Sequence, residues 1–172
     1  MMKPELKKPD ESMENEFILF NEEWEAYGEK LVPYAARRRG LTYDAWKNEA
    51  ERLEIEAPSD MVTAHVWFLM SEGRILGAIA LRDTLNDYLR GVGGHIGYGV
   101  RPSERRKGYA DLMLKEVLVL SLERGMKRVL ITCNQGNTGS EKVIIRNGGK
   151  LENVIEDGDE MVARYWIKLT SD

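Results

Sequence analysis

The stretch from Val100 to Ala110 has the residue types and spacing best suited to chemistry, and it reads VRPSERRKGYA. If a helix begins here, its first turn presents unpaired backbone N–H groups and the positive end of the helix dipole, which favour an anion. Gly108 lets a ligand approach the backbone closely because it has no Cβ. Small Ala110 leaves room beside it, and the basic run at 105–107 adds positive charge. The pattern predicts a site for a diphosphate group.

Each feature around this site also has a plainer structural interpretation. A basic triplet at the start of a helix is often only a solvated turn. Glycines in a strand, such as those of HIGYGV at 95–100, often mark a bulge, and Asn137 can be a simple helix cap. The three features nevertheless lie at the spacings that one ligand would require, and this joint placement favours the ligand site.

Apolar segments separated by turn residues predict the strands that would position this loop. We place these strands at 63–70, 74–82, 95–100, 128–133, 150–155 and 161–169. The first two and the last two flank short turns and predict antiparallel hairpins. The third and fourth are joined by an amphipathic helix at 106–124, and a strand, helix and strand in that order form the βαβ unit of a parallel pair. The predicted fold class is α/β, with a mixed, mostly antiparallel sheet flanked by helices, including a short one at 140–147.

The first third of the chain is rich in Glu, Lys, Ala, Leu and aromatic residues. Segments 14–39 and 43–55 predict helices that are interrupted near Pro33 and Gly40. Residues 3–7 predict a short edge strand. This helical region has less recognisable pattern than the strands that follow it.

The composition indicates one acidic globular domain. The 172 residues are 42% hydrophobic, which is enough for a core without disulfides. The formal net charge of -4 supplies no global positive field for nucleic acid or an anionic membrane. Cys133 is the only cysteine, which excludes an intrachain disulfide and a cysteine-rich zinc site. With no secretory or membrane-spanning run, we expect a soluble cytoplasmic protein with no metal and no nucleic-acid or membrane partner.

The motif Arg105-x-x-Gly108-x-Ala110, after a strand that ends at Val100, resembles the pyrophosphate loop [QR]-x-x-G-x-[GA] of the GCN5-related N-acetyltransferase (GNAT) family. The motif alone is short, but its context is similar as well. An amphipathic helix and an apolar strand follow it, and then comes Asn137 with a serine three residues later. The resemblance covers roughly Arg74 to Leu169, and the region before Pro58 fits only by its general helical character.

The resemblance implies an acyltransferase that moves the acetyl group of acetyl-CoA to a primary amine of a small molecule or peptide, by direct attack in a ternary complex. It implies a single N-acetyltransferase domain over 1–172, with a helical acceptor-side region at 1–58 and a sheet and acetyl-CoA-binding core at 59–172. Two parallel strands, 95–100 and 128–133, would splay apart to admit the pantetheine arm. Dimers are common among similar proteins, so a homodimer is possible on this resemblance.

The resemblance also implies a cofactor site in three parts. Backbone groups of the glycine-containing strand would pair with the pantetheine arm as an added strand does. Amides of the motif would hold the pyrophosphate, and the Asn-x-x-Ser pair matches a position that contacts pantetheine. The implied cofactor-binding residues are Gly99, Val100, Arg105, Arg106, Lys107, Gly108, Tyr109, Ala110, Asn137 and Ser140.

The catalytic residues are not located by the motif. Many members of the family place a Tyr in the short helix after the Asn to protonate the leaving thiolate, but Ile144 stands at the matching position. His95 has the intrinsic pKa of a base at neutral pH. Tyr98 is on the same predicted strand and, by period-two alternation, on the opposite face. His95 and Tyr98 are the catalytic candidates, although a strand histidine is often structural.

The acceptor site has a weaker signal. The candidate substrate residues are Asp83, Asn86 and Asp87, which follow a predicted strand and would attract a cationic amine, or else form only a solvated connection. A non-catalytic acyl-CoA-binding sensor or partner module is the alternative function, and Ile144 favours it. A P-loop nucleotide-binding protein is excluded because the chain has no GxxxxGK[ST] run.

Overall fold

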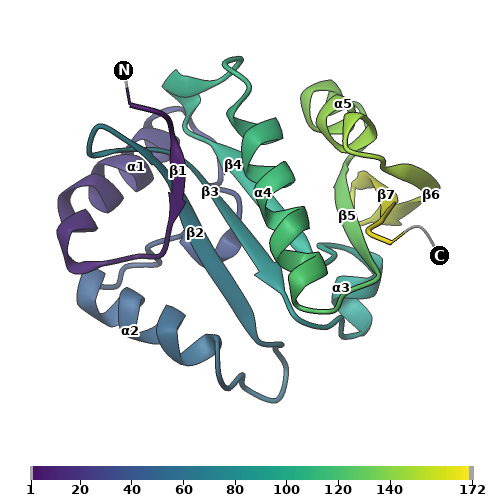
Figure 1. Ribbon diagram of the computed structural model, residues 1–172, viewed down its shortest axis with the longest axis horizontal. Helices are drawn as coiled ribbons and strands as arrows, with labels where there is room; N and C mark the ends of the chain where they lie inside the picture. The colour runs from purple at the N-terminus through teal and green to yellow at the C-terminus, as the bar shows by residue number, and fades with distance from the viewer. Residues whose placement is uncertain (1, 171–172) are drawn as a thin grey trace.

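The computed structural model describes residues 2–170 (Figure 1). Three short 3-10 turns, at 11–13, 34–36 and 102–104, accompany the helices and strands. In chain order these are β1 (Glu5–Lys7), α1 (Glu14–Ala26), α2 (Tyr43–Leu53), β2 (Ala64–Ser71), β3 (Arg74–Arg82), α3 (Asp87–Gly91), β4 (Ile96–Val100), α4 (Tyr109–Glu123), β5 (Arg128–Asn134), α5 (Thr138–Arg146), β6 (Lys150–Asp157) and β7 (Glu160–Lys168).

The strands form two antiparallel sheets that meet at one point. The first sheet has the order β1-β2-β3-β4 and the second the order β5-β7-β6. A single bridge joins them across the residues described, between Gly94 and Ile131, and its local geometry is antiparallel. Beyond that bridge β4 and β5 run in the same direction, β4 toward the loop before α4 and β5 toward α5 (Figure 1). The predicted α/β fold with mostly antiparallel strands and a splayed pair is confirmed, and the division into two sheets adds to it.

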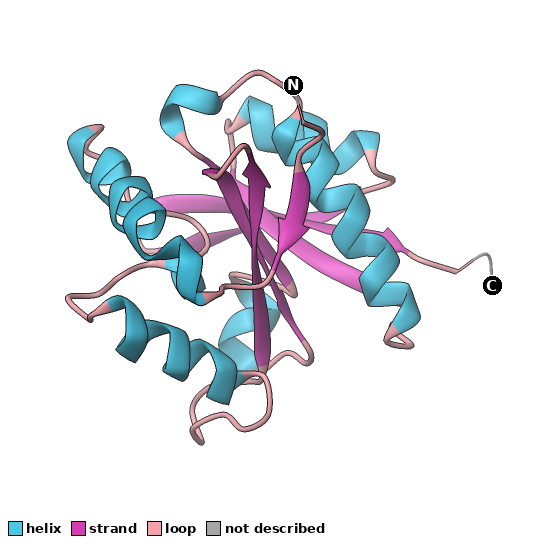
Figure 2. Cartoon of the chain, turned by 60° about the vertical axis from the view of Figure 1, so that its left-hand side comes forward, coloured by secondary structure: helices cyan, strands magenta, loops and turns pink. Residues whose placement is uncertain are grey.

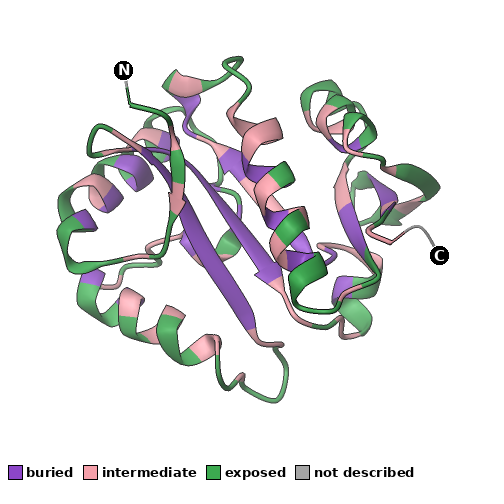
Figure 3. Cartoon of the chain, in the orientation of Figure 1, coloured by how far each residue is buried: buried purple, intermediate pink, exposed green. Residues whose placement is uncertain are grey.

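Strand β2 is apolar from Val66 to Met70 because both of its faces are covered. Val66, Phe68 and Met70 pack in the cluster formed with α1 and α2, whereas Trp67 and Leu69 pack in the cluster formed with α4. Successive side chains of a strand point to opposite faces, so one continuous apolar run serves two cores. Figure 2 shows the strands enclosed between helices on both sides, and Figure 3 shows β2 and β3 buried along their length.

The predicted helix at 14–39 is wrong beyond Ala26. Helix α1 ends there, and the chain continues as a loop that passes Gly28, with φ 71°, and a cis Val32–Pro33 peptide bond. The apolar residues that suggested more helix serve another purpose, because Leu31 is buried in the core formed with α1 and α2. This loop, residues 27–33, is called the crossing loop below because it passes over β4.

One short strand and two helices complete the comparison with the predicted elements. The predicted edge strand is confirmed, since β1 pairs with β2. Helix α4 begins at Tyr109 rather than 106, because Arg106 and Gly108 have φ values of 64° and 83°, in the left-handed region that a helix cannot continue through. Helix α3 lies in what was predicted as a plain connection. Among residues 2–170, none of the helices has the length and apolar character to cross a membrane.

Candidate functional site

A cavity of about 720 Å³ lies between β4 and β5, where the two sheets separate. Its walls come from β4, β5, the start of α5 and the crossing loop with the turn that follows it. The predicted loop before α4 reaches the same cavity through Arg105 and Ala110. The structure therefore brings the segments singled out in the sequence around one space.

Strand β4 directs alternate backbone groups into this cavity. At its two ends, Arg101 N–H donates to Leu76 O at 2.8 Å, and His95 O accepts from Arg82 N–H at 2.7 Å. These ladder bonds belong to odd-numbered residues of the strand, and in an antiparallel pair the residues between them point their N–H and C=O groups the other way. The backbone groups of Ile96, Tyr98 and Val100 therefore point toward β5.

Strand β5 presents a matching row from the opposite side. Gln135 N–H donates to Met161 O at 2.7 Å and Leu169 N–H to Lys127 O at 2.9 Å, so odd-numbered residues of β5 pair with β7. By the same alternation, the backbone groups of Thr132 turn toward β4. An extended chain of amides placed between the two strands would find donors and acceptors on both sides.

Hydrogen bonds join the start of β4 to β5 at the closed end of the cavity. His95 N–H donates to Leu130 O at 2.8 Å, and the Leu130 N–H donates to Nδ1 of the His95 ring at 2.9 Å. A Cβ on Gly94 would lie 2.4 Å from Leu130 O, so only glycine allows this approach. Burial, with the nearby charges of Arg82 and Arg128, lowers the pKa of His95 to about 4. The ring is a neutral clamp between the sheets, and His95 is not among the residues that line the cavity.

The glycines of β4 make room for the crossing loop. A Cβ on Gly99 would lie 2.1 Å from Val32 O, and one on Gly97 would lie 3.3 Å from the Cβ of Pro33. The loop thus packs directly on the backbone of the strand and forms one wall of the cavity. The HIGYGV pattern is a close chain crossing rather than a bulge, since the β3–β4 register is continuous.

A network of buried charges anchors the segment before the predicted diphosphate loop. Arg101 is 3% exposed, and its guanidinium donates to Glu16 at 2.9 Å and to Glu23 at 2.6 Å. Glu23 also accepts from the backbone N–H of Ser103 at 2.7 Å. Burial raises the pKa of Glu23, but the hydrogen bonds from Ser103 and Arg101 outweigh it, and the net pKa is lowered. Helix α1 therefore fixes the position from which the loop departs.

The diphosphate loop has the backbone geometry of an anion site. Gly108 is the N-cap of α4 with φ 83°, no side chain caps the helix, and the space where its Cβ would stand is open. Among the residues described, the backbone N–H groups from Arg106 to Ala110 find no acceptor. Lys107 pairs with Glu104 at 2.7 Å. Consecutive free N–H groups at a helix start are the arrangement that binds phosphate.

Arg105 is held against the crossing loop. Its guanidinium donates two hydrogen bonds to the Glu29 carboxylate, at 3.1 and 2.5 Å, and lies 5.0 Å from the ring centroid of Trp24. Trp24 is 5% exposed, and its Nε1 is a buried donor for which residues 2–170 offer no acceptor. Trp24 lines the cavity. Sequence reasoning missed it, because its apolar spacing in α1 indicated only a core residue.

Tyr98 and Ser140 meet inside the cavity. The phenol oxygen of Tyr98 lies 2.8 Å from the Ser140 Oγ, and both residues line the space. Burial raises the pKa of Tyr98 to about 12, and burial also raises the pKa of the neighbouring Cys133 thiol to about 11. Asn137, the predicted pantetheine contact, caps α5 by accepting from Ser140 N–H at 3.3 Å. At neutral pH the cavity wall therefore holds a protonated phenol next to a hydroxyl.

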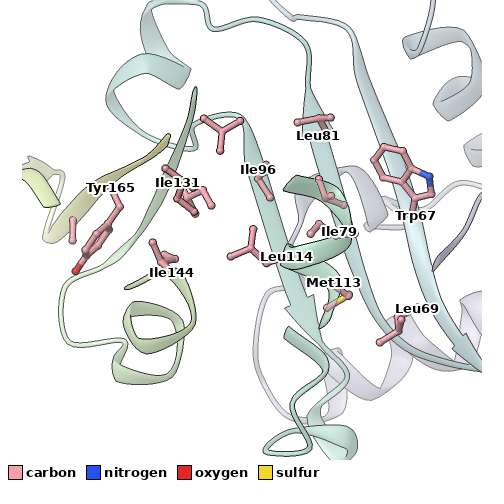
Figure 4. Packing of buried hydrophobic residues seen from close by; sticks show 14 of the residues in the cluster. Trp67, Leu69, Ile79, Leu81, Ile96, Met113, Leu114, Ile131, Ile144 and Tyr165 are labelled. Atoms are coloured by element: carbon pink, nitrogen blue, oxygen red, sulfur yellow. The ribbon is translucent and has the colours of Figure 1, made fainter. Parts of the chain in front are cut away.

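Ile144 does not reach the cavity. It is fully buried in the core between α4 and the second sheet, where Figure 4 shows it near Ile131 and Tyr165. The position at which the resemblance places a Tyr is a packing position in this chain. The Tyr98 hydroxyl arrives at the cavity from β4 instead.

The predicted acceptor residues are not brought together. Asp83 is occupied by Thr63, His65 and Arg124, and Asp87 is exposed beside Arg90. Neither carboxylate is among the residues that line the larger cavity or a second cavity next to it. Asn86 caps α3 and lines this second cavity, which has a volume of about 450 Å³. The charged groups that do reach both spaces are arginines, which are described below.

Comparison with known proteins identifies a family. The family described as the acetyltransferase (GNAT) domain matches residues 9–150. No curated protein sequence matches the chain.

Several solved structures share the fold. RimL, a ribosomal L7/L12 alpha-N-protein acetyltransferase in complex with coenzyme A, has 17% identity and a TM-score of 0.74 over 100% of this chain and 97% of that chain. The microcin C7 self-immunity acetyltransferase MccE, with acetyl-CoA and AMP, has 16% identity and a TM-score of 0.71 over 98% and 93%. YncA from Salmonella typhimurium, a putative acetyltransferase with its cofactor acetyl-CoA, has 14% identity and a TM-score of 0.66 over 98% and 95%.

Proposed function

Since the chain belongs to the acetyltransferase (GNAT) family and is an acyltransferase of that kind, we propose that it moves the acetyl group of acetyl-CoA to a primary amine of a small molecule or peptide, by direct attack in a ternary complex. The observation that carries this proposal is the cavity in which the facing edges of β4 and β5 lead to the free N–H groups of the diphosphate loop. Bound coenzyme A or acetyl-CoA in the similar structures supports the choice of cosubstrate.

The residues around the cavity fit coenzyme A in two respects. The N–H groups from Arg106 to Ala110 would hold the pyrophosphate, with Arg105 exchanging Glu29 for a phosphate oxygen. The edge groups of Tyr98 and Val100 on β4 would pair with the amides of pantetheine as an added strand does. Gly99 belongs to the same wall, but its backbone groups face β3, so its part is to admit the crossing loop.

Acetyl-CoA supplies the acetyl group as a thioester, whose C–S bond breaks as the acceptor nitrogen bonds to the carbonyl carbon. The acceptor must be neutral to attack, and the nitrogen then loses one proton to water. Backbone N–H groups at the open edges of β4 and β5 would stabilise the negative charge that develops on the carbonyl oxygen. The chain thus contributes orientation and fixed dipoles more than a dedicated base.

We assign Tyr98 to the leaving thiolate. With a pKa of about 12 the phenol stays protonated at neutral pH, while an ordinary thiol has a pKa near 8.5. The phenol therefore donates a hydrogen bond to the thiolate instead of giving up its proton. Ser140 orients the phenol, and water provides the proton that yields free thiol. His95, the other catalytic candidate, is assigned the clamp at Leu130 instead.

The alternative is a non-catalytic acyl-CoA-binding module. Ile144, which is buried in the core, favours this alternative. Many members of the family have a Tyr at this position that protonates the leaving thiolate, and isoleucine cannot do so. The two functions differ in one measurement, the release of free thiol from acetyl-CoA in the presence of a panel of primary amines. We expect amine-dependent thiol release together with N-acetylated product. Saturable binding of acetyl-CoA without thiol release for any amine would favour the binding module.

A further inference from the structure

The two cavities share one boundary. Tyr34, Arg37, Arg82 and Gly93 line both of them. The diphosphate loop belongs to the larger cavity alone. A molecule seated in the second cavity would therefore reach the larger one past two guanidinium groups.

These two arginines have no carboxylate partner within residues 2–170. One nitrogen of the Arg82 guanidinium donates to Gly93 O at 3.2 Å and to Gly94 O at 3.0 Å. The Nε of Arg37 donates to Leu31 O at 2.6 Å. A guanidinium has five N–H donors, so each arginine keeps donors for another acceptor. Burial lowers the pKa of Arg82, which means that its charge is poorly solvated where it stands.

The remaining arginines of the two cavities behave differently. Arg105 is paired with Glu29, and Arg39 is paired with Glu49 at 3.0 Å. Arg37 and Arg82 are both partly exposed, and partial burial of a cation without a counter-ion has a desolvation cost that an anionic ligand would offset. The pattern points to an anionic group of the acceptor at Arg37 and Arg82.

The other charges that face these spaces do not neutralise the two arginines. Asp157 and Glu160 line the larger cavity from the second sheet, and Glu160 accepts from the Asn134 amide at 2.7 Å. Lys30, on the crossing loop, adds positive charge. Two carboxylates line the second cavity, Asp60 and Glu49, and Glu49 is already paired with Arg39.

The second cavity has mainly apolar walls around this charged boundary. Its lining side chains include Trp46, Leu53, Met61, Val62 and Leu89. Its volume of about 450 Å³ is within the range of small-molecule sites. The body of an acceptor in this space would be apolar, and only its reacting end would be polar.

We propose that the acceptor is a primary amine that carries a carboxylate close to the reacting nitrogen and an apolar body. Arg37 and Arg82 bind the carboxylate, the second cavity holds the body, and the nitrogen enters the larger cavity. This inference rests on the proposed acetyl transfer and names its substrate class. The chemistry is met by a free apolar amino acid or by a peptide that begins with an acidic residue.

The two guanidinium groups also act on the nitrogen itself. A positive charge close to an ammonium group disfavours its protonated form and lowers its pKa. The carboxylate offsets part of this effect, but the surplus positive charge leaves a larger fraction of neutral amine. The boundary therefore helps to supply the nucleophile that direct attack requires.

The test compares acceptors that differ in the carboxylate alone. With acetyl-CoA present, leucine is compared with 3-methylbutylamine, its decarboxylated counterpart, and with leucinamide. The second arm of the test uses a peptide amide that begins with Asp-Leu. Its comparison with leucine shows whether the carboxylate belongs to a free amino acid or to the acidic first residue of a peptide. We expect kcat/KM to be about 10- to 100-fold higher with the carboxylate than without it. Equal values for leucine and 3-methylbutylamine, and for the Asp peptide and its Asn counterpart, would overturn the inference.

The variant Arg37→Met separates the carboxylate contact from general damage. It should remove the advantage of the carboxylated acceptor, so that the kcat/KM values of leucine and 3-methylbutylamine in this variant come within about twofold of each other. Arg38→Met is the matched control, because Arg38 also donates to a backbone carbonyl, that of Leu41 at 3.0 Å, and lines neither cavity. A carboxylate preference that survives in Arg37→Met and in Arg82→Met would contradict the assignment.

A binding measurement keeps the inference independent of turnover. With coenzyme A present, calorimetric titration of leucine and of the Asp-Leu peptide amide should show that at least one binds and that Arg37→Met weakens it. Binding of coenzyme A with no binding of either carboxylated acceptor would overturn the inference and leave the proposed function standing. Absence of coenzyme A binding would instead contradict the proposed function, on which the inference depends.

Discussion

The proposed diphosphate loop and the proposed acceptor site at the shared boundary of the two cavities illustrate two ways to build a binding site. The loop would bind phosphate through backbone N–H groups of residues that are consecutive in the chain, from Arg106 to Ala110. The boundary joins side chains from two distant segments, Arg37 after the crossing loop and Arg82 at the end of β3. A backbone site leaves a local sequence signature, whereas a side-chain site depends on the fold that gathers it.

The comparison is tested most strongly by Gly108→Glu. A carboxylate at the start of α4 would repel the pyrophosphate, and we expect coenzyme A to bind at least about 100-fold more weakly in calorimetric titration. The φ of 83° adds only about 1 kcal/mol of backbone strain to the free energy of unfolding.

Gly125→Glu is the matched control, since Gly125 has the same φ of 83° and the same open space at the other end of α4. It should cost similar stability and leave coenzyme A affinity unchanged. Unchanged coenzyme A affinity in Gly108→Glu would mean that the backbone N–H groups at the start of α4 do not bind the pyrophosphate, and the contrast with the side-chain site would be lost.

Tyr98→Phe should lower kcat about 10- to 100-fold and leave the affinity for coenzyme A within a few fold. The hydroxyl is assigned to the leaving thiolate, and removal of one such donor costs about this much. Because the pKa of Tyr98 is about 12, its ionisation should not shape the pH dependence of kcat below pH 10. Wild-type turnover in Tyr98→Phe would exclude the phenol from catalysis.

Gly99→Ala tests whether the crossing loop or the cofactor requires this glycine. The added methyl would stand 2.1 Å from Val32 O, and we expect a loss of about 1–3 kcal/mol in the free energy of unfolding. Gly91→Ala, where the nearest atom is 3.7 Å away, should be close to neutral. Chemical denaturation measures both, and wild-type stability in Gly99→Ala would mean that the loop does not pack here.

His95 predicts a pH dependence of stability. Its pKa of about 4 in the folded chain lies below the ordinary value of 6.5. The unfolded chain therefore binds more protons between pH 6.5 and 4, and stability is lost as the pH falls through this window, by up to about 3 kcal/mol. His95→Asn should lose less stability than wild type between pH 7 and 4.5. If wild type and His95→Asn lose the same stability over this pH range, the neutral His95 ring does not hold the two sheets together.

The sequence predicted most of the strands, because they depend on patterns within short segments, and strand β3 begins and ends where its apolar run does. The motif from Arg105 to Ala110 does contain the left-handed Gly108 and the start of α4, and its binding of a diphosphate stays a prediction. The path of the crossing loop was not predicted, since it depends on the contact of Val32 with Gly99, far along the chain. The predicted acceptor carboxylates Asp83 and Asp87 lie away from the larger cavity for the same reason, because Asp83 pairs with Arg124, the residue that follows α4.

The most direct test of the account is a calorimetric titration of coenzyme A compared with one of pantetheine, which lacks the diphosphate. We predict one site per chain, with coenzyme A bound at least about 100-fold more tightly than pantetheine, because the N–H groups at the start of α4 hold the phosphates. Equal affinities for the two compounds, or no heat with coenzyme A on folded protein, would contradict it.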